Sequence, residues 1–330
     1  MQSAQTFDIE GVDFAFDDQP DLHAVLARLR TRKPYAVVPF AGTPAVLLLT
    51  DELVRAAFRD EVTFPAAPVY AVTTEPVFGR TVLSMSGNEH RANRMMVSAP
   101  LRRNRVQESA SEFTEYVAPL LAERRREPRD DMISMLIAAT TEDAQSLDDE
   151  QICRFLRMLF PLGADTTMLA LGNILSALLN HREQLDLLRS DLERHVQQAV
   201  WEGMRWEPAV GMLPRACPEA VTWHGIEIPA STPMIFAINA AHRDPAVYER
   251  PDEFDITRNV MPAVSFGQGP HSCIGNWLAN TELVAALRLL MRRLPDLTLN
   301  PEQAHTSTIT SQVGTTLRGP NALHVTFTPG

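Results

Sequence analysis

One cysteine stands in a setting that could give it metal chemistry. Cys273 lies in residues 264–278, VSFGQGPHSCIGNWL, with Gly267 and Gly269 before it and Gly275 after it. Glycines beside a cysteine allow backbone N–H groups to approach the sulfur, because they carry no Cβ. The residues that follow have apolar positions at helical spacing, and a helix N-terminus favours an anion. We therefore expect Cys273 to carry a thiolate, the form that binds metals.

Other interpretations of this stretch remain open. A lone cysteine after a glycine-rich turn is often a buried free thiol. The GQG triplet resembles the start of a dinucleotide loop, but Ser272 stands where the third glycine belongs and no βαβ unit follows. A thiolate held against a flat, bulky group is also how cysteine ligates haem iron, where the sulfur pushes electron density toward O–O cleavage.

Two cations precede a long apolar segment. His90 and Arg94 lie one turn apart in a predicted helix over residues 89–99, so both side chains point the same way. They could simply lie on a solvated face. Facing two carboxylates, they would make charge-assisted hydrogen bonds.

The long apolar segment predicts a central helix that begins with a capping box formed by Ser146 and Asp149. Its two apolar stripes, which begin at Ile152 and Leu171, differ in phase by about 100°. Between them lies residues 161–167, PLGADTT, whose proline and glycine predict a kink or bulge. The alternative is two separate helices, the second capped by Asp165.

These features together resemble the cytochrome P450 family. FGQGPHSCIG matches the haem-ligand loop of that family position by position, at Phe266, Gly267, Gly269, His271, Cys273 and Gly275. The resemblance extends from about Phe16 to the C-terminus and implies haem b as cofactor, with Cys273 as the iron ligand. It also implies that His90, Arg94 and Arg215 contact the haem propionates.

The resemblance assigns roles to the central segment as well. Gly163 would make room for dioxygen, and Asp165 with Thr166 would deliver protons to it. Leu162, where the family usually has a small residue, and the nearby Pro161 depart from the pattern.

A second signature of the family is structural. Glu202 and Arg205 lie three residues apart in a predicted helix over 192–206, a spacing that on an exposed surface is worth only about 0.2–0.5 kcal/mol. In the family this pair forms a buried cluster with a later arginine, here Arg258. We assign the cluster to holding the cysteine loop.

The implied protein is mainly α with a small β region, a single domain over residues 1–330. It would insert one oxygen atom from O2 into a mostly apolar small molecule, with electrons from NAD(P)H through a ferredoxin reductase and a ferredoxin. Arginines at 102, 103, 105, 292 and 293 could form a basic face for that partner, or be merely solvated.

Composition agrees with a large globular core. The chain has 330 residues, 45% of them apolar, and a net charge of −11, with Lys33 its one lysine, which argues against nucleic-acid binding. Three cysteines without metal spacing suit the cytoplasm. The N-terminal sequence shows no signal peptide or membrane anchor, so no membrane partner is expected.

One departure from the family is large. Arg94 and Asp165 are 71 positions apart, about 70 fewer than in the family, and the gap falls between Arg105 and Ser109. Part of the helical core and the substrate lid would then be missing, which leaves the apolar central helix exposed at Leu159, Phe160, Leu162 and the stripe at 171–179. Three outcomes are then open: the helix over 109–126 covers this surface, a second copy of the chain covers it, or the protein is unstable. A haem-binding relic without turnover, or residues lost from the gene model, are the alternatives.

Apolar periodicity and turn residues predict the remaining elements. Helices are expected over 21–32, 51–59, 109–126 and 131–139; strands over 35–40, 45–50, 220–223, 226–228, 233–239, 297–299 and 323–328. The first two strands should form a hairpin about the turn Ala41-Gly42-Thr43, and the last two a C-terminal hairpin. The helix over 51–59 should be capped by Thr50 or Asp51. Residues 63–79, with three prolines, are expected to be irregular.

Overall fold

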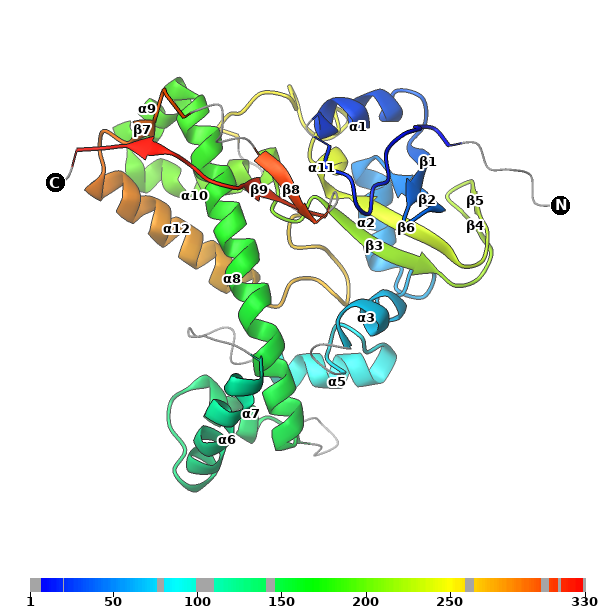
Figure 1. Ribbon diagram of the computed structural model, residues 1–330, viewed down its shortest axis with the longest axis vertical. Coiled ribbons are helices and arrows are strands. Elements are labelled where there is room, and N and C mark those ends of the chain that lie inside the picture. The colour runs from blue at the N-terminus through cyan, green and yellow to red at the C-terminus, as the bar shows by residue number, and fades with distance from the viewer. Residues whose placement is uncertain are drawn as a thin grey trace. The chain divides into compact units, whose positions relative to one another are not determined.

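A computed structural model describes residues 7–19, 21–75, 80–98, 110–140, 146–258, 264–303, 309–313 and 316–328. In residues 95–98, 110–115, 160 and 309–313 only the backbone is described. The described chain is mostly helical with small sheets, as predicted (Figure 1).

The chain forms two compact units, neither of which is one continuous stretch. Unit 1 comprises Met1–Phe64, Thr166–Gly269 and Asn280–Gly330; unit 2 comprises Pro65–Asp165 and Pro270–Ala279. The single-domain interpretation stays a prediction.

Unit 1 contains the main sheet, with strand order β1-β2-β6-β3. The strands are β1 (Tyr35–Phe40), β2 (Thr43–Leu48), β3 (Met212–Cys217) and β6 (Thr232–Ala237). β1 and β2 form the predicted hairpin, and its turn places Ala41 and Gly42 at φ 50° and 72°. Two consecutive residues with positive φ form a two-residue turn whose twist matches that of the paired strands. β1 therefore ends at Phe40 and β2 begins at Thr43.

One helix covers each face of this sheet. Alternate residues of β2 point to opposite sides: Ala45 and Leu47 pack with α1 (Leu22–Arg30), and Val46 and Leu48 pack with α2 (Asp51–Arg59). The Thr50 hydroxyl accepts a hydrogen bond from the Leu53 N–H and so caps α2, as expected.

The central helix α8 (Asp149–Asn180) is unbroken through residues 161–167, so the two-helix alternative is wrong (Figure 1). The predicted capping box is displaced. The Gln151 N–H donates to Asp148 Oδ1 at 2.7 Å and the Asp148 N–H donates to Gln151 Oε1 at 2.9 Å. The box therefore starts two residues later than Ser146, since a glutamine reaches back further than the aspartate at 149.

The phase change in α8 has a simple structural cause: its two halves pack into different cores. The first stripe lies in the core of unit 2. The second lies in the helical core of unit 1, with α9 (Arg182–Ser190), α10 (Leu192–Trp206) and α12 (Asn276–Arg293). Gly203 permits the close crossing of α10, because a Cβ there would lie 2.5 Å from Ile174 Cγ1.

The expectation that α8 is left uncovered is largely wrong. Ile174 and Leu178 are fully buried by the helices of unit 1, and Leu159 is buried by those of unit 2. Leu162 is 43% exposed, as expected, and Met168 is 66% exposed. The side chain of Phe160, and the predicted gap between Arg105 and Ser109, lie outside the described residues.

Unit 2 is helical, with α3 (Ala67–Thr73), α5 (Gly87–Ser98), α6 (Ala110–Arg126) and α7 (Met132–Ala138). α3 contradicts the prediction of irregular chain over 63–79. Its proline lies in the first turn, where a missing N–H costs no hydrogen bond. Val117 and Leu121 of α6 and Leu136 of α7 pack against the first half of α8.

Short elements complete unit 1. They are β4 (Val221–Trp223), β5 (Ile226–Ile228), α11 (Ile238–Ala241), β7 (Thr298–Leu299), β8 (Ile309–Val313), β9 (Leu317–Pro320) and β10 (Val325–Thr326). β7 pairs with β10 as predicted, and the β8–β9 pair between them was not predicted. Among the described residues α8 alone is long and apolar enough to span a membrane, a property that the core helix of a soluble protein shares.

Candidate haem-thiolate site

The stem of the cysteine loop is tightly held within unit 1. Val264 is fully buried, and the Ser265 hydroxyl donates to the carbonyl oxygen of Met204 in α10 at 3.3 Å. Gly269 has φ 71°, and a Cβ there would lie 2.3 Å from the Phe58 carbonyl oxygen. Only glycine fits this position, because both the backbone conformation and the close approach exclude a side chain.

Cys273 itself lies in unit 2, and its side chain is exposed on one side. The backbone N–H of Gly275 and the charge of Arg94 lower the pKa of the Cys273 thiol, but desolvation by the surrounding protein outweighs them and raises it. The expected resting thiolate is therefore wrong for the chain alone. The groups that favour a thiolate are present, and a bound cation would add to them.

His90 and Arg94 both reach the cysteine loop, as their spacing on α5 allows. The Arg94 guanidinium donates to the backbone carbonyl oxygen of Ser272, and to the Ser272 hydroxyl at 3.2 Å. The His90 ring stacks on the His271 ring, with centroids 4.1 Å apart. Unit 2 thus brings together four predicted residues within one loop and one helix: His90, Arg94, His271 and Cys273.

The predicted ion cluster of Glu202, Arg205 and Arg258 forms within unit 1. Glu202 and Arg205, both fully buried, make a bidentate pair with two contacts of 2.7 Å. Arg258 Nε lies 3.4 Å from Glu202 Oε2. Three carbonyl oxygens accept the remaining Arg205 N–H groups, those of His242, Pro251 and Glu253. Because every N–H group of Arg205 is paired, much of the desolvation cost of burying its charge is offset.

The remaining predicted residues lie on α8 and on the sheet. Gly163 has no atom within 4 Å of the place where a Cβ would be. Asp165 is exposed and Thr166 half-buried. Arg215, in β3, is buried; its guanidinium lies over the Phe236 ring, 5.8 Å from the centroid, and donates to the Pro214 carbonyl oxygen.

A buried polar network in unit 1 was not predicted. Glu207 Oε2 lies 2.7 Å from His23 Nε2, and Glu207 Oε1 accepts from Arg318 Nε at 2.9 Å. The Asn173 amide of α8 donates to the Glu207 and Arg318 carbonyl oxygens. Despite burial, His23 and Arg318 lower the pKa of Glu207 to about 2. No sequence signal joins these residues, because they are far apart in the chain.

The donor set fits a porphyrin-bound iron. Among the described residues no three His, Cys, Asp or Glu side chains gather to hold a metal ion by themselves. Cys273 can therefore offer a single sulfur ligand, so the other ligands must come from the bound group. Haem provides four nitrogen ligands, and the N–H donors of His90 and Arg94 suit its carboxylates.

The family model for cytochrome P450 matches residues 103–325. The chain belongs to the cytochrome P450 family. Proteins of this family bind haem b, which the donor set of the cysteine loop fits. The polyketide biosynthesis cytochrome P450 PksS of Bacillus subtilis is 31% identical over 300 residues, which are 88% of this chain and 73% of PksS.

Other curated relatives match over a shorter span. The steroid C26-monooxygenase of Mycolicibacterium smegmatis is 32% identical over 225 residues, 68% of this chain and 55% of that protein. The chain spans about half the length of the first curated relatives that it matches.

Solved structures agree on the fold of this cytochrome P450. That of CYP109Q5 from Chondromyces apiculatus has a TM-score of 0.82 at 21% identity, over 94% of this chain and 97% of that chain. That of PksS has a TM-score of 0.79 at 23% identity, over 94% and 97%.

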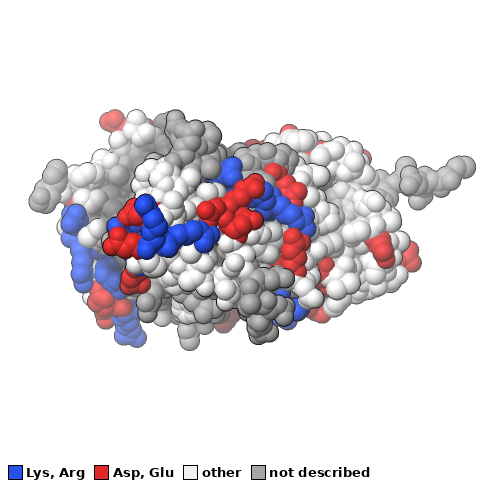
Figure 2. Space-filling model, turned by 90° about the horizontal axis from the view of Figure 1, so that it is seen from below, with Lys and Arg blue, Asp and Glu red and all other residues white. Residues whose placement is uncertain are grey.

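The predicted basic face lies partly outside the described residues, and part of the rest is paired with acidic side chains. Arginines 102, 103 and 105 lie outside the described residues, and Arg292 is paired with Glu193 at 2.9 Å. Exposed pairs such as Arg125–Asp149 and Arg129–Glu123 occupy unit 2. Figure 2 shows basic and acidic side chains beside one another on one face, so a partner there would meet both charges.

Proposed function

We propose that this cytochrome P450 is a monooxygenase that inserts one oxygen atom from O2 into a mostly apolar small molecule. Electrons would come from NAD(P)H through a ferredoxin reductase and a ferredoxin, in the cytoplasm, with no nucleic-acid or membrane partner. The observation that carries the proposal is Cys273, an accessible thiol beside the Gly275 N–H and Arg94. A relative named as a steroid C26-monooxygenase supports the reaction class.

Haem b, when bound, supplies the redox chemistry that activates dioxygen. Cys273 would lose its proton as its sulfur binds, because a thiolate and not a thiol is the metal ligand. The Gly275 N–H would then stabilise the charge on the sulfur. His90, Arg94 and Arg215 would hold the propionates, and the cluster of Glu202, Arg205 and Arg258 would keep the loop stem in place through α10.

Proton delivery would rest on α8. Asp165 is exposed, so it can exchange protons with water, and Thr166 follows it at the next helical position. A hydroxyl can accept a proton from a carboxyl group or water and pass on its own. Gly163 leaves the helix surface one turn before Thr166 without a side chain, which keeps room for a small molecule.

A haem-binding protein without turnover is the second candidate. The exposure of Leu162 and Asp165 favours it, because an open site admits water and wastes electrons as peroxide. Product formation separates the two candidates. With NADPH, a ferredoxin and its reductase, a monooxygenase consumes NADPH in step with product, and a non-turnover protein makes no product.

The haem ligand is tested by the spectrum of the reduced carbonyl complex. We expect the red-shifted Soret band of a cysteine ligand in the native chain and its loss in Cys273→Ala. Cys217→Ala removes a buried thiol elsewhere and is the matched control. A band that survives in Cys273→Ala contradicts the ligand assignment.

A further inference from the structure

The strand β9 and the residues that follow α10 form a buried junction with α8 inside unit 1 (Figure 1). The Asn173 side chain of α8 is fully buried, and its Nδ2 donates to the Glu207 carbonyl oxygen at 3.0 Å and to the Arg318 carbonyl oxygen at 3.1 Å. Gly319 lies so close to α8 that a Cβ on it would be 2.4 Å from Leu169 Cδ2. One amide therefore ties two distant segments of the chain to the same helix.

A buried ion pair holds the two segments to each other. Glu207 and Arg318 are 4% and 2% exposed, and Arg318 Nε donates to Glu207 Oε1 at 2.9 Å. The pKa of Glu207 is about 2, so the carboxylate is charged at neutral pH, as the guanidinium is. The backbone N–H of Arg318 also donates to the Ala209 carbonyl oxygen at 2.9 Å. The pair thus fixes β9 on the segment that follows α10.

Thr166 lies on the face of α8 that this junction covers. Thr166, Leu169 and Asn173 are separated by three and then four positions, so their side chains follow one another along one side of the helix. Residues 162–165 are exposed, and Met168 is 66% exposed. Leu169 is the first buried residue after Thr166, so its contact with β9 is where this side of α8 becomes anchored.

We propose that Glu207, Arg318 and Asn173 are positioning residues that fix Thr166. The ion pair sets the place of β9, and Asn173 ties α8 to both members of the pair. A helix is stiff over one or two turns, so a shift of α8 at Asn173 is carried to Thr166. The three residues act through Thr166 and not on the substrate. The proposal rests on the proposed function, because the role of Thr166 in proton delivery belongs to it.

Amide hydrogen exchange of the full chain tests the anchor without turnover. Asn173→Leu keeps the shape of the side chain and removes both bonds to the carbonyl oxygens. The Oδ1 atom that is lost with them has no hydrogen-bond partner among the described residues. Exchange at residues 166–173 should become at least about tenfold faster than the loss of global stability accounts for, because two local bonds are missing.

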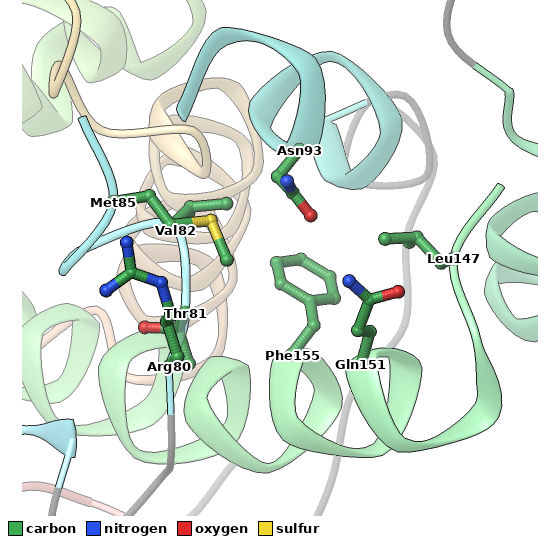
Figure 3. Close-up of a pocket in the computed structure, with 8 residues that line it drawn as sticks. All are labelled: Arg80, Thr81, Val82, Met85, Asn93, Leu147, Gln151 and Phe155. Atoms are coloured by element: carbon green, nitrogen blue, oxygen red, sulfur yellow. The ribbon is translucent and has the colours of Figure 1, made fainter. Parts of the chain in front are cut away.

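The control for a general loss of stability comes from unit 2. Leu147 is 3% exposed and lines a cavity of about 20 Å³, which has room for about one water molecule (Figure 3). Leu147→Ala enlarges this cavity and lowers the global stability without a change at the junction in unit 1. Exchange at residues 166–173 should then change no more than the global stability does. A merely structural role of Asn173 would give this result in Asn173→Leu too.

Turnover with NADPH, a ferredoxin and its reductase tests the consequence for the reaction. Asn173→Leu should give at least about threefold less product per NADPH consumed, and more peroxide, because a misplacement of about 1 Å can cost about 10²-fold. Leu147→Ala should keep the native ratio of product to NADPH.

Glu207→Gln is a second variant of the same junction. It keeps the backbone carbonyl that accepts from Asn173 and removes the charge that faces Arg318. We expect faster exchange at residues 166–173 and less product per NADPH, as in Asn173→Leu. It replaces Asn173→Leu in both measurements if that chain does not fold.

Two results overturn the proposal. One is exchange at residues 166–173 that changes no more than the global stability in these variants. The other is faster exchange there with an unchanged ratio of product to NADPH. A native chain that forms no product contradicts the proposed function instead. The exchange measurement alone then decides whether the junction fixes Thr166, and faster exchange supports it.

Discussion

The Arg94 guanidinium donates two hydrogen bonds to Ser272, the residue directly before Cys273. This contact joins α5 to the ligand loop through a charged donor, and such bonds contribute about 1.5–3 kcal/mol each. Arg94→Gln should therefore release haem at least about tenfold faster, measured by transfer to an excess of apomyoglobin. Arg91→Gln, on the same helix and exposed, is the control, and equal rates for the two variants would contradict this role.

Gly269 should tolerate no side chain. Gly269→Ala combines the strain of a positive φ with a Cβ that meets the Phe58 carbonyl oxygen, and we expect a loss of at least about 2 kcal/mol in the free energy of unfolding. Gly225→Ala has φ 76° and nothing within 4 Å, so it carries the strain alone. Urea titration of both variants measures the difference. Equal losses would show that the contact with Phe58 is unimportant.

Replacement of Arg205 alone, with Glu202 kept, should strongly lower the free energy of unfolding. Arg205→Met leaves the carboxylate of Glu202 buried without its bidentate partner, which costs about 3–5 kcal/mol. Arg182→Met breaks an exposed pair with Asp186 and should cost less than about 1 kcal/mol. Thermal or urea unfolding decides between them. Similar small losses in both variants would contradict this prediction, and would mean that water takes the place of Arg205 beside Glu202.

His242 should make the fold sensitive to acid. Burial, and then the charges of Arg205, Arg55 and Arg243, lower its pKa to about 3, whereas an unfolded histidine titrates near 6.5. Between these values the unfolded chain binds a proton that the folded chain does not, so stability falls as the pH falls through this window and is full above it.

From pH 7 to pH 5 this histidine should cost about 2 kcal/mol in the free energy of unfolding. Urea titrations at the two pH values measure the loss of stability. In His242→Gln, most of the loss that is attributed to this histidine should disappear. His23→Gln is the comparison, because the pKa of His23 is also lowered and it acts in the same direction. Glu207 adds to the loss of stability only below about pH 4.5, because its pKa falls from 4.5 in the unfolded chain to about 2 in the folded one.

If the chain turns over, Thr166→Ala should uncouple it. Oxygen consumption continues, but loss of a positioned hydroxyl slows proton delivery by about 10²–10⁴-fold and more oxygen leaves as peroxide. Peroxide and product are measured against NADPH consumed. Thr167→Ala, at the next position of α8, is the control. Unchanged coupling in Thr166→Ala would remove this hydroxyl from the mechanism.

Local signals in the sequence predicted most helices and strands of the main sheet. The strand β1, the helices α2 and α10 and the turn at Ala41–Gly42 all follow from periodicity and turn residues within a few positions. The helix α3 was missed because prolines were counted as breakers, although a proline in a first turn fits a helix.

Contacts between distant residues needed the family resemblance or were missed. The cluster of Glu202, Arg205 and Arg258 was predicted from family positions and is present. The bond between His23 and Glu207 joins residues 184 positions apart, and no periodicity or spacing encodes such a pair. The thiolate was mispredicted because proximity of N–H groups was counted and the opposing desolvation of the sulfur was not.

The division of α8 between two cores has a consequence for dissecting this protein. Residues up to Asp165 belong to one unit and residues from Thr166 to the other, and the short segment Pro270–Ala279 returns to unit 2 between two stretches of unit 1. No single cut in the chain separates the units, and any fragment that contains all of unit 2 also carries a large part of unit 1. The shortest continuous stretch that contains all of unit 2, with Cys273 and α5, runs from residue 65 to residue 279 and includes residues 166–269 of unit 1.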